Sequence, residues 1–207
     1  NNGSYRKTPE IGDKPEILSF EFSSPIVIPA GVKKILVTVN QTNIRDISET
    51  PFLIAGTKKD KDTSWFYGCK ELSTFIETEN LDNPKPNANF FINVTGEKIK
   101  AISSFNNKIL SHNTNDVLIE TQMHSCSSAY QYWARNFKLS DFGISNNEEY
   151  IIHSGQVGIN EVGWQANLTF NIYKIDDNFP NSFSEKDLIG SSQTIEPWPG
   201  IGRQSQI

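Results

Sequence analysis

Acidic and hydroxyl side chains recur at alternate positions just before Trp65, a pattern that can bind calcium. Asp60, Asp62 and Ser64 have the spacing of positions 1, 3 and 5 of a calcium-binding loop, and Glu71 falls at position 12. Position 6 of such a loop requires glycine for its sharp turn, but Trp65 occupies it here. We therefore expect a charged turn exposed to solvent, and retain Asp60 and Asp62 as weak candidates for a looser calcium site.

The motifs of the common catalytic sites are absent from the sequence. It contains no G-x-S-x-G nucleophile elbow and no phosphate-binding P-loop. The three histidines, His112, His124 and His153, do not show the HxH or HExxH spacing of zinc sites. The sequence therefore predicts a protein without catalytic activity, and calcium is the only cofactor retained as a candidate.

A segment rich in aromatic and amide side chains, residues 130–136, has the composition of a sugar-binding surface. In a strand, Gln131, Trp133 and Arg135 share one face. If the opposite face forms the core, Trp133 is exposed to stack on a sugar ring, and Gln131 and Arg135 hydrogen-bond the sugar hydroxyls. The alternative interpretation places Trp133 in the core, with Arg135 at its rim. Trp65, beside the charged loop, is the second candidate for a binding aromatic.

The elements that position these residues are predicted to be β-strands, because apolar and polar residues alternate along most of the chain. Leu168, Phe170 and Ile172 share one face of the segment 164–175, whereas neutral polar residues occupy the other. Residues 32–40 alternate likewise, with Ile35, Val37 and Val39 expected to point inward. The predicted strands cover residues 16–22, 26–28, 32–40, 52–55, 65–69, 73–78, 90–94, 98–105, 116–124, 129–137, 149–153, 156–161 and 164–175.

Short strands at this spacing, separated by turn residues, predict a single all-β domain. We expect an antiparallel β-sandwich or jelly-roll-like fold over residues 16–176. Residues 1–15 are interpreted as an N-terminal arm, and residues 177–207 as an extended C-terminal tail containing proline and glycine. Because proline has no backbone N–H to donate to a neighbouring strand, Pro25 indicates a strand at the edge of a sheet. Ser154 and Gly155 are expected to form the turn of a hairpin.

Composition narrows the set of partners. The net charge is −5, and no cluster of Lys and Arg provides the basic surface that nucleic acid requires. No run approaches the roughly 20 apolar residues of a transmembrane helix. The two cysteines, Cys69 and Cys126, are predicted to form a disulfide, with buried free thiols as the alternative; a disulfide favours a secreted or cell-surface location.

These observations favour a secreted or surface carbohydrate-binding protein of the lectin or adhesin type, whose partner is a glycan or a cell-surface glycoconjugate. Two other classes stay open. A structural or assembly protein, such as a capsid, fibre, coat or inclusion component, would use the proline-containing tails for contacts within a homo-oligomer. A membrane-acting toxin subunit would refold its alternating strands, which are rich in Ser, Thr and Asn, into a barrel.

Overall fold

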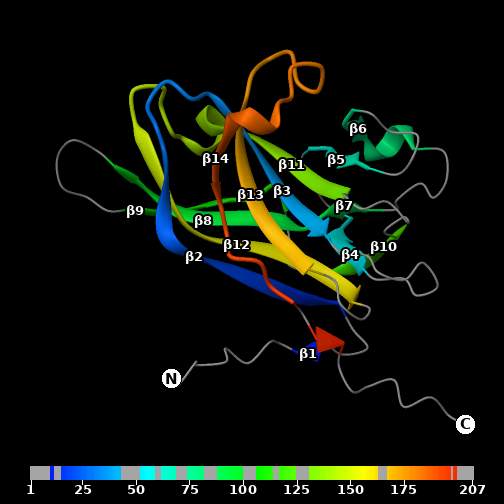
Figure 1. Cartoon of the computed structure of the whole chain (residues 1–207). Helices are drawn as coiled ribbons and strands as arrows, with labels where there is room; N and C mark the ends of the chain where they lie inside the picture. The colour runs from blue at the N-terminus through cyan, green and yellow to red at the C-terminus, as the bar shows by residue number, and fades with distance from the viewer. Residues whose placement is uncertain are drawn as a thin grey trace, which may run out of the picture.

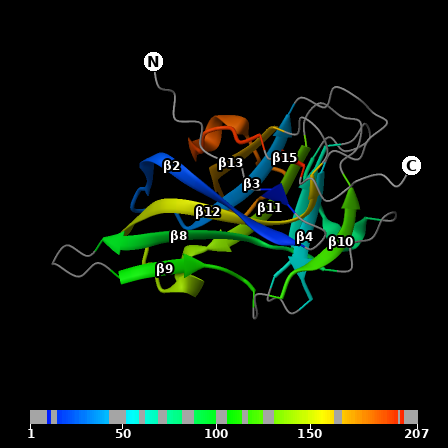
Figure 2. The ribbon, with the colours of Figure 1, turned by 90° about the horizontal axis from the view of Figure 1, so that it is seen from below.

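A computed structural model of the chain describes most of the predicted sandwich. The described residues are 10–11, 15–42, 52–58, 62–68, 74–81, 88–99, 106–113, 117–124, 131–162, 167–196 and 198–199. They form two large antiparallel sheets, as the alternation predicts, and Figures 1 and 2 show these sheets stacked as two layers. Among these residues, no helix is long and apolar enough to cross a membrane.

The seven-stranded sheet is organised around its longest strand, β12 (Glu149–Val162). Strand β12 pairs with β2 on one side and with β8 and then β4 on the other. Strand β2 has no second pairing partner among the described strands, so Pro25 lies in an edge strand as predicted. The remaining members of this sheet are β2 (Glu16–Ile28), β4 (Phe52–Thr57), β7 (Asn89–Phe90), β8 (Ile92–Ile99), β9 (Asn106–Leu110) and β10 (Ile119–His124).

The six-stranded sheet has the order β14-β13-β3-β11-β5-β6. Its central strand β3 pairs antiparallel with β13 on one side and with β11 on the other. The bounds of its strands are β3 (Lys34–Thr42), β5 (Ser64–Tyr67), β6 (Ile76–Glu77), β11 (Gln131–Lys138), β13 (Asn167–Ile175) and β14 (Leu188–Ser191).

The main hydrophobic core lies between the two sheets and is formed by apolar residues at alternate positions of the strands. Ile35, Val37 and Val39 are all fully buried there, which confirms the alternation predicted for this strand. Phe170 of β13 packs against Phe20 of β2, with 5.3 Å between the ring centroids, so the core joins the two layers directly.

A second apolar cluster covers the outer face of the six-stranded sheet. We call it the outer cluster; its buried members are Leu36, Trp65, Phe75, Tyr132, Ala134, Tyr173 and Ile175. Phe179 and Phe183, from the segment between β13 and β14, pack against it. This face is therefore covered by the chain itself, and Figure 1 shows that segment looping above the end of β13. Tyr173, which lies on the face of 164–175 opposite Leu168, Phe170 and Ile172, is 4% exposed.

Two boundary predictions differ from the structure. The predicted hairpin at Ser154 and Gly155 is wrong, because β12 continues through both residues with only a bulge after Ile152. Gly155 is needed for close packing: a Cβ there would lie 2.4 Å from Cζ of Phe170. The sandwich also extends beyond residue 176, since β14 pairs with β13.

The segments at the two ends of the chain meet each other. Strand β1 (Glu10–Ile11) lies in the predicted N-terminal arm, and β15 (Trp198–Pro199) lies in the predicted C-terminal tail. They pair in parallel to form a separate two-stranded sheet. The two tails thus contact one another within a single chain, and the homo-oligomer expected from them stays a prediction.

Candidate functional site

The inner face of β11 does not form the binding surface that the sequence suggested. Trp133 and Gln131 are 0% exposed and Arg135 is 1% exposed, so the interpretation that they face solvent is wrong. The alternative interpretation, which places Trp133 in the core, is confirmed, although Arg135 is buried and does not lie at a rim. Trp133 lies between the sheets beside Phe66, with 5.8 Å between the ring centroids. Both faces of β11 are buried, because the outer cluster covers the face opposite Trp133. A ligand in solution cannot reach these three side chains in this fold.

Arg135 has a structural role in the buried interior. Its Nη1 donates hydrogen bonds to Oγ of Ser64, at 3.2 Å, and to the main-chain oxygen of Phe90, at 3.4 Å. Oγ of Ser64 also accepts a hydrogen bond from the backbone N–H of Phe90, at 2.7 Å. Arg135 therefore helps to join β11 and β5 to β7, across the two layers.

Trp65 is also buried, at 8% exposure, so the prediction of an exposed binding aromatic is wrong there too. Its ring meets Phe179 edge to face, with 4.8 Å between centroids. Trp65 belongs to the outer cluster, and this cluster forms the base of the pocket described below.

The candidate calcium site is not assembled among the described residues. Asp60 lies outside them. Asp62 is exposed; its Oδ1 accepts the backbone N–H of Thr63 at 2.8 Å, and its Oδ2 lies 3.7 Å from Nε2 of His112. That histidine nitrogen is also 2.8 Å from the main-chain oxygen of Asn136. Within the described part of the chain, no three His, Cys, Asp or Glu side chains are grouped to hold a metal ion.

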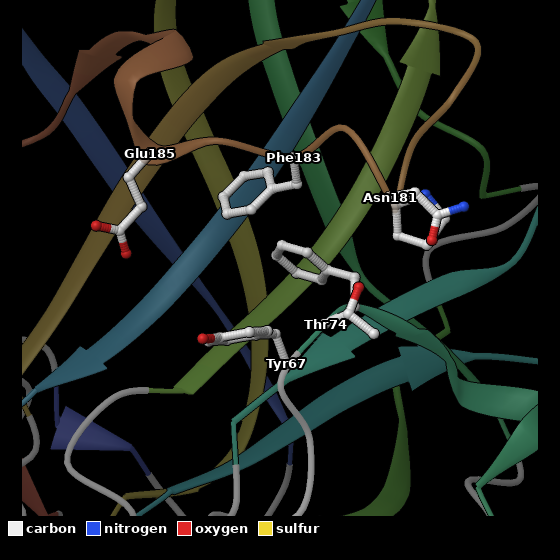
Figure 3. Close-up of a pocket in the computed structure, with 7 residues that line it drawn as sticks. Tyr67, Thr74, Asn181, Phe183 and Glu185 are labelled. Atoms are coloured by element: carbon white, nitrogen blue, oxygen red, sulfur yellow. The ribbon is translucent and has the colours of Figure 1, made fainter.

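A pocket of about 420 Å³ opens above the outer cluster (Figure 3). Its walls come from two parts of the sequence: the region from the end of β5 to the start of β6, and the segment between β13 and β14. The lining residues are Tyr67, Thr74, Phe75, Pro180, Asn181, Phe183 and Glu185.

Aromatic rings form the floor and two walls of this pocket. Phe75 is 2% exposed and forms the floor, whereas Tyr67 and Phe183 are half-buried and present ring surface to the opening. Phe183 meets Phe75 edge to face at 4.8 Å and 83°, and Tyr67 lies 5.4 Å from Phe75. Each ring packs against another, and these contacts stabilise the walls of the pocket.

Polar groups flank the rings on both sides. Figure 3 shows Glu185 on one side of Phe183 and Asn181 on the other, with the hydroxyl of Tyr67 directed to the same side as Glu185. The hydroxyl of Tyr132 donates a 2.6 Å hydrogen bond to Oε1 of Glu185. Burial and this bond raise the pKa of Tyr132, so it remains a donor at neutral pH. One oxygen of the Glu185 carboxylate is thereby held in place.

The segment that carries Asn181 and Glu185 is fixed by local hydrogen bonds. Oδ1 of Asp176 accepts the backbone N–H of Asn178 at 2.8 Å and the hydroxyl of Ser182 at 2.5 Å. These bonds lower the pKa of Asp176, which keeps the carboxylate ionised. Further along, the short helix η3 (Glu185–Asp187) begins after Ser184, whose hydroxyl accepts the N–H of Lys186 at 3.2 Å. Asn181 and Glu185 are therefore both carried by segments of the backbone that local hydrogen bonds stabilise.

None of the lining residues belonged to the site predicted from the sequence. Asn181, Phe183 and Glu185 lie in the segment interpreted as a tail, which has no strand periodicity. Phe179 and Phe183 were the available signal, since two aromatic rings in a polar segment gain stability by packing against an apolar face.

Comparisons with known proteins add no identification. A scan against protein-family models and searches among curated proteins and solved structures found no match. The fold and the site define an all-β sandwich with an aromatic pocket on the outer face of one sheet.

Proposed function

We propose that this protein binds a carbohydrate in the pocket of the outer cluster. The observation that carries the proposal is the combination of aromatic walls with an amide, hydroxyls and a carboxylate around one opening. The apolar face of a sugar ring packs on exposed aromatic rings, and its hydroxyls need fixed donors and acceptors. Tyr67 and Phe183 supply the aromatic rings. Thr74, Asn181 and Glu185 supply donors and acceptors, and Glu185 is fixed by its hydrogen bond from Tyr132.

The dimensions of the pocket support this proposal. A volume of about 420 Å³ falls in the range of small-ligand pockets, which extends from about 300 to 1,000 Å³. The rings are already in contact with one another, so binding needs little reorganisation of the protein. Preorganised walls of this kind favour recognition of a small rigid ligand over a flexible one.

Recognition is favoured over glycoside cleavage by the number of acids in the described lining. Hydrolysis of a glycosidic bond uses two carboxyl groups about 5 to 9.5 Å apart. Among the described residues that line the pocket, Glu185 is the one carboxylate. If the ligand is an extracellular glycan, the protein works outside the cell or on its surface, as the sequence analysis expected.

A glycan array probed with the intact protein tests the proposal, followed by titration with the sugars that give signal. Asn181→Ala should weaken binding about 3- to 10-fold, the usual effect of losing one hydrogen bond, without changing the melting temperature. Asn178→Ala is the matched control, because Asn178 is exposed in the same turn and does not line the pocket. Phe183→Ala should weaken binding further by removing one wall. The proposal fails if a broad array, with and without calcium, gives no signal.

A further inference from the structure

Among the described lining residues, charge lies at one end of the pocket, and this acidic end points to the class of sugar that the pocket takes. Glu185 is exposed at one end, and neither Lys nor Arg is among the described lining residues. Oε1 of Glu185 accepts the hydrogen bond from Tyr132, whereas no described residue donates to Oε2. One carboxylate oxygen is therefore held in place, and the other is available to a ligand.

Aromatic rings beside this carboxylate strengthen the preference for positive charge. The faces of Tyr67 and Phe183 carry the negative potential of their π-electrons, which attracts a cation near the ring centre. Figure 3 shows the Glu185 carboxylate and the Tyr67 hydroxyl toward one side of the Phe183 ring, while Asn181 lies on the other. A ligand that spans the ring thus meets an acid at one end and an amide at the other.

We propose that the pocket recognises an amino sugar, with the protonated amine beside Oε2 of Glu185 and the sugar ring on Phe183. This inference rests on the proposed carbohydrate-binding function and narrows it to sugars with a free amine. A sugar with a hydroxyl or an acetamido group at the same position is uncharged there, so it forms neither the ion pair with Glu185 nor the cation–π contact with the rings. Since Glu185 is exposed and screened by solvent, we expect the preference to be about tenfold.

The test compares three tetrasaccharides of β-1,4-linked sugars: glucosamine, N-acetylglucosamine and glucose. Titration of the intact protein by calorimetry at pH 6 should give about tenfold tighter binding of the glucosamine tetramer than of the other two. Glu185→Gln should remove this preference, so that the variant binds the three tetramers with about equal affinity. Asp187→Asn is the matched control, since Asp187 lies on the same helix η3 and does not line the pocket.

The outcomes separate this inference from the proposed function. Equal affinity for the three tetramers, or a preference that survives in Glu185→Gln, overturns the amino-sugar inference but leaves carbohydrate binding standing. A failure of all three tetramers, together with a glycan array that lacks signal, overturns both. The comparison among ligands uses the unmodified protein, so it stands even if a variant folds poorly.

Discussion

Truncation of Trp133 should destabilise the fold and not act through a binding surface. Its side chain is fully buried between the sheets beside Phe66, so Trp133→Ala leaves a cavity in the core. A large ring of this kind buries about 200 Å², which gives about 5 kcal/mol at 25 cal/mol per Å². Measured costs of such truncations are about 3–5 kcal/mol. This is a large fraction of the about 5–15 kcal/mol by which a domain is stable.

The assay is urea unfolding at 25 °C followed by far-UV circular dichroism, which reports mainly on the backbone of the strands and so can be compared with and without the tryptophan. We expect Trp133→Ala to lose about 3–5 kcal/mol and its melting temperature to fall by about 6–20 °C. The control is Ile109→Ala, because Ile109 is 58% exposed and its truncation should cost less than about 0.5 kcal/mol. A loss below about 1 kcal/mol for Trp133→Ala, with an unchanged dependence on urea, would contradict the burial of Trp133 in the core and would indicate a surface residue.

Three further predictions concern stability. Gly155→Ala should cost about 1–3 kcal/mol in thermal unfolding, because the added methyl overlaps the ring of Phe170; an unchanged melting temperature would contradict the close packing. The pKa of Glu148 is lowered to about 2, first by a hydrogen bond from a backbone N–H and then by Lys98. The ionised carboxylate therefore contributes fully to the free energy of unfolding above about pH 4.5, and this contribution is lost as the pH falls through about 2. The stability difference between the wild-type protein and Glu148→Gln should therefore shrink over that window in a pH series of thermal melts, whereas a constant difference would argue against this pairing. The predicted disulfide between Cys69 and Cys126, both outside the described residues, would close a loop of about 57 residues and contribute about 4 kcal/mol; intact-mass measurement before and after alkylation should show no free thiol.

Alternation along a strand predicted the core faces well, since the period of two depends only on local geometry. Val37 and Val39 in β3, and Leu168 and Phe170 in β13, point inward as expected. Alternation does not predict burial where a non-local contact decides it. Strand β11 is buried on both faces, because residues after β13 fold back and pack over Tyr132.

The candidate site was missed for the same physical reason. A pocket formed by β5, the start of β6 and the segment after β13 depends on the order of strands in the sheet, which a single sequence does not reveal. The role of Gly155 also depends on a residue that is distant in the sequence. Glycine commonly marks a turn, but here it allows the ring of Phe170 to pack against the backbone of a continuous strand.

A map of backbone amide chemical shifts during titration with a sugar that binds would show directly whether the pocket of the outer cluster is the binding site. If the pocket is the binding site, the largest shift changes will fall at Tyr67, Thr74, Phe75 and residues 181–185. Changes concentrated instead on the outer face of the seven-stranded sheet, for example at Thr95 and His153, would contradict the claim.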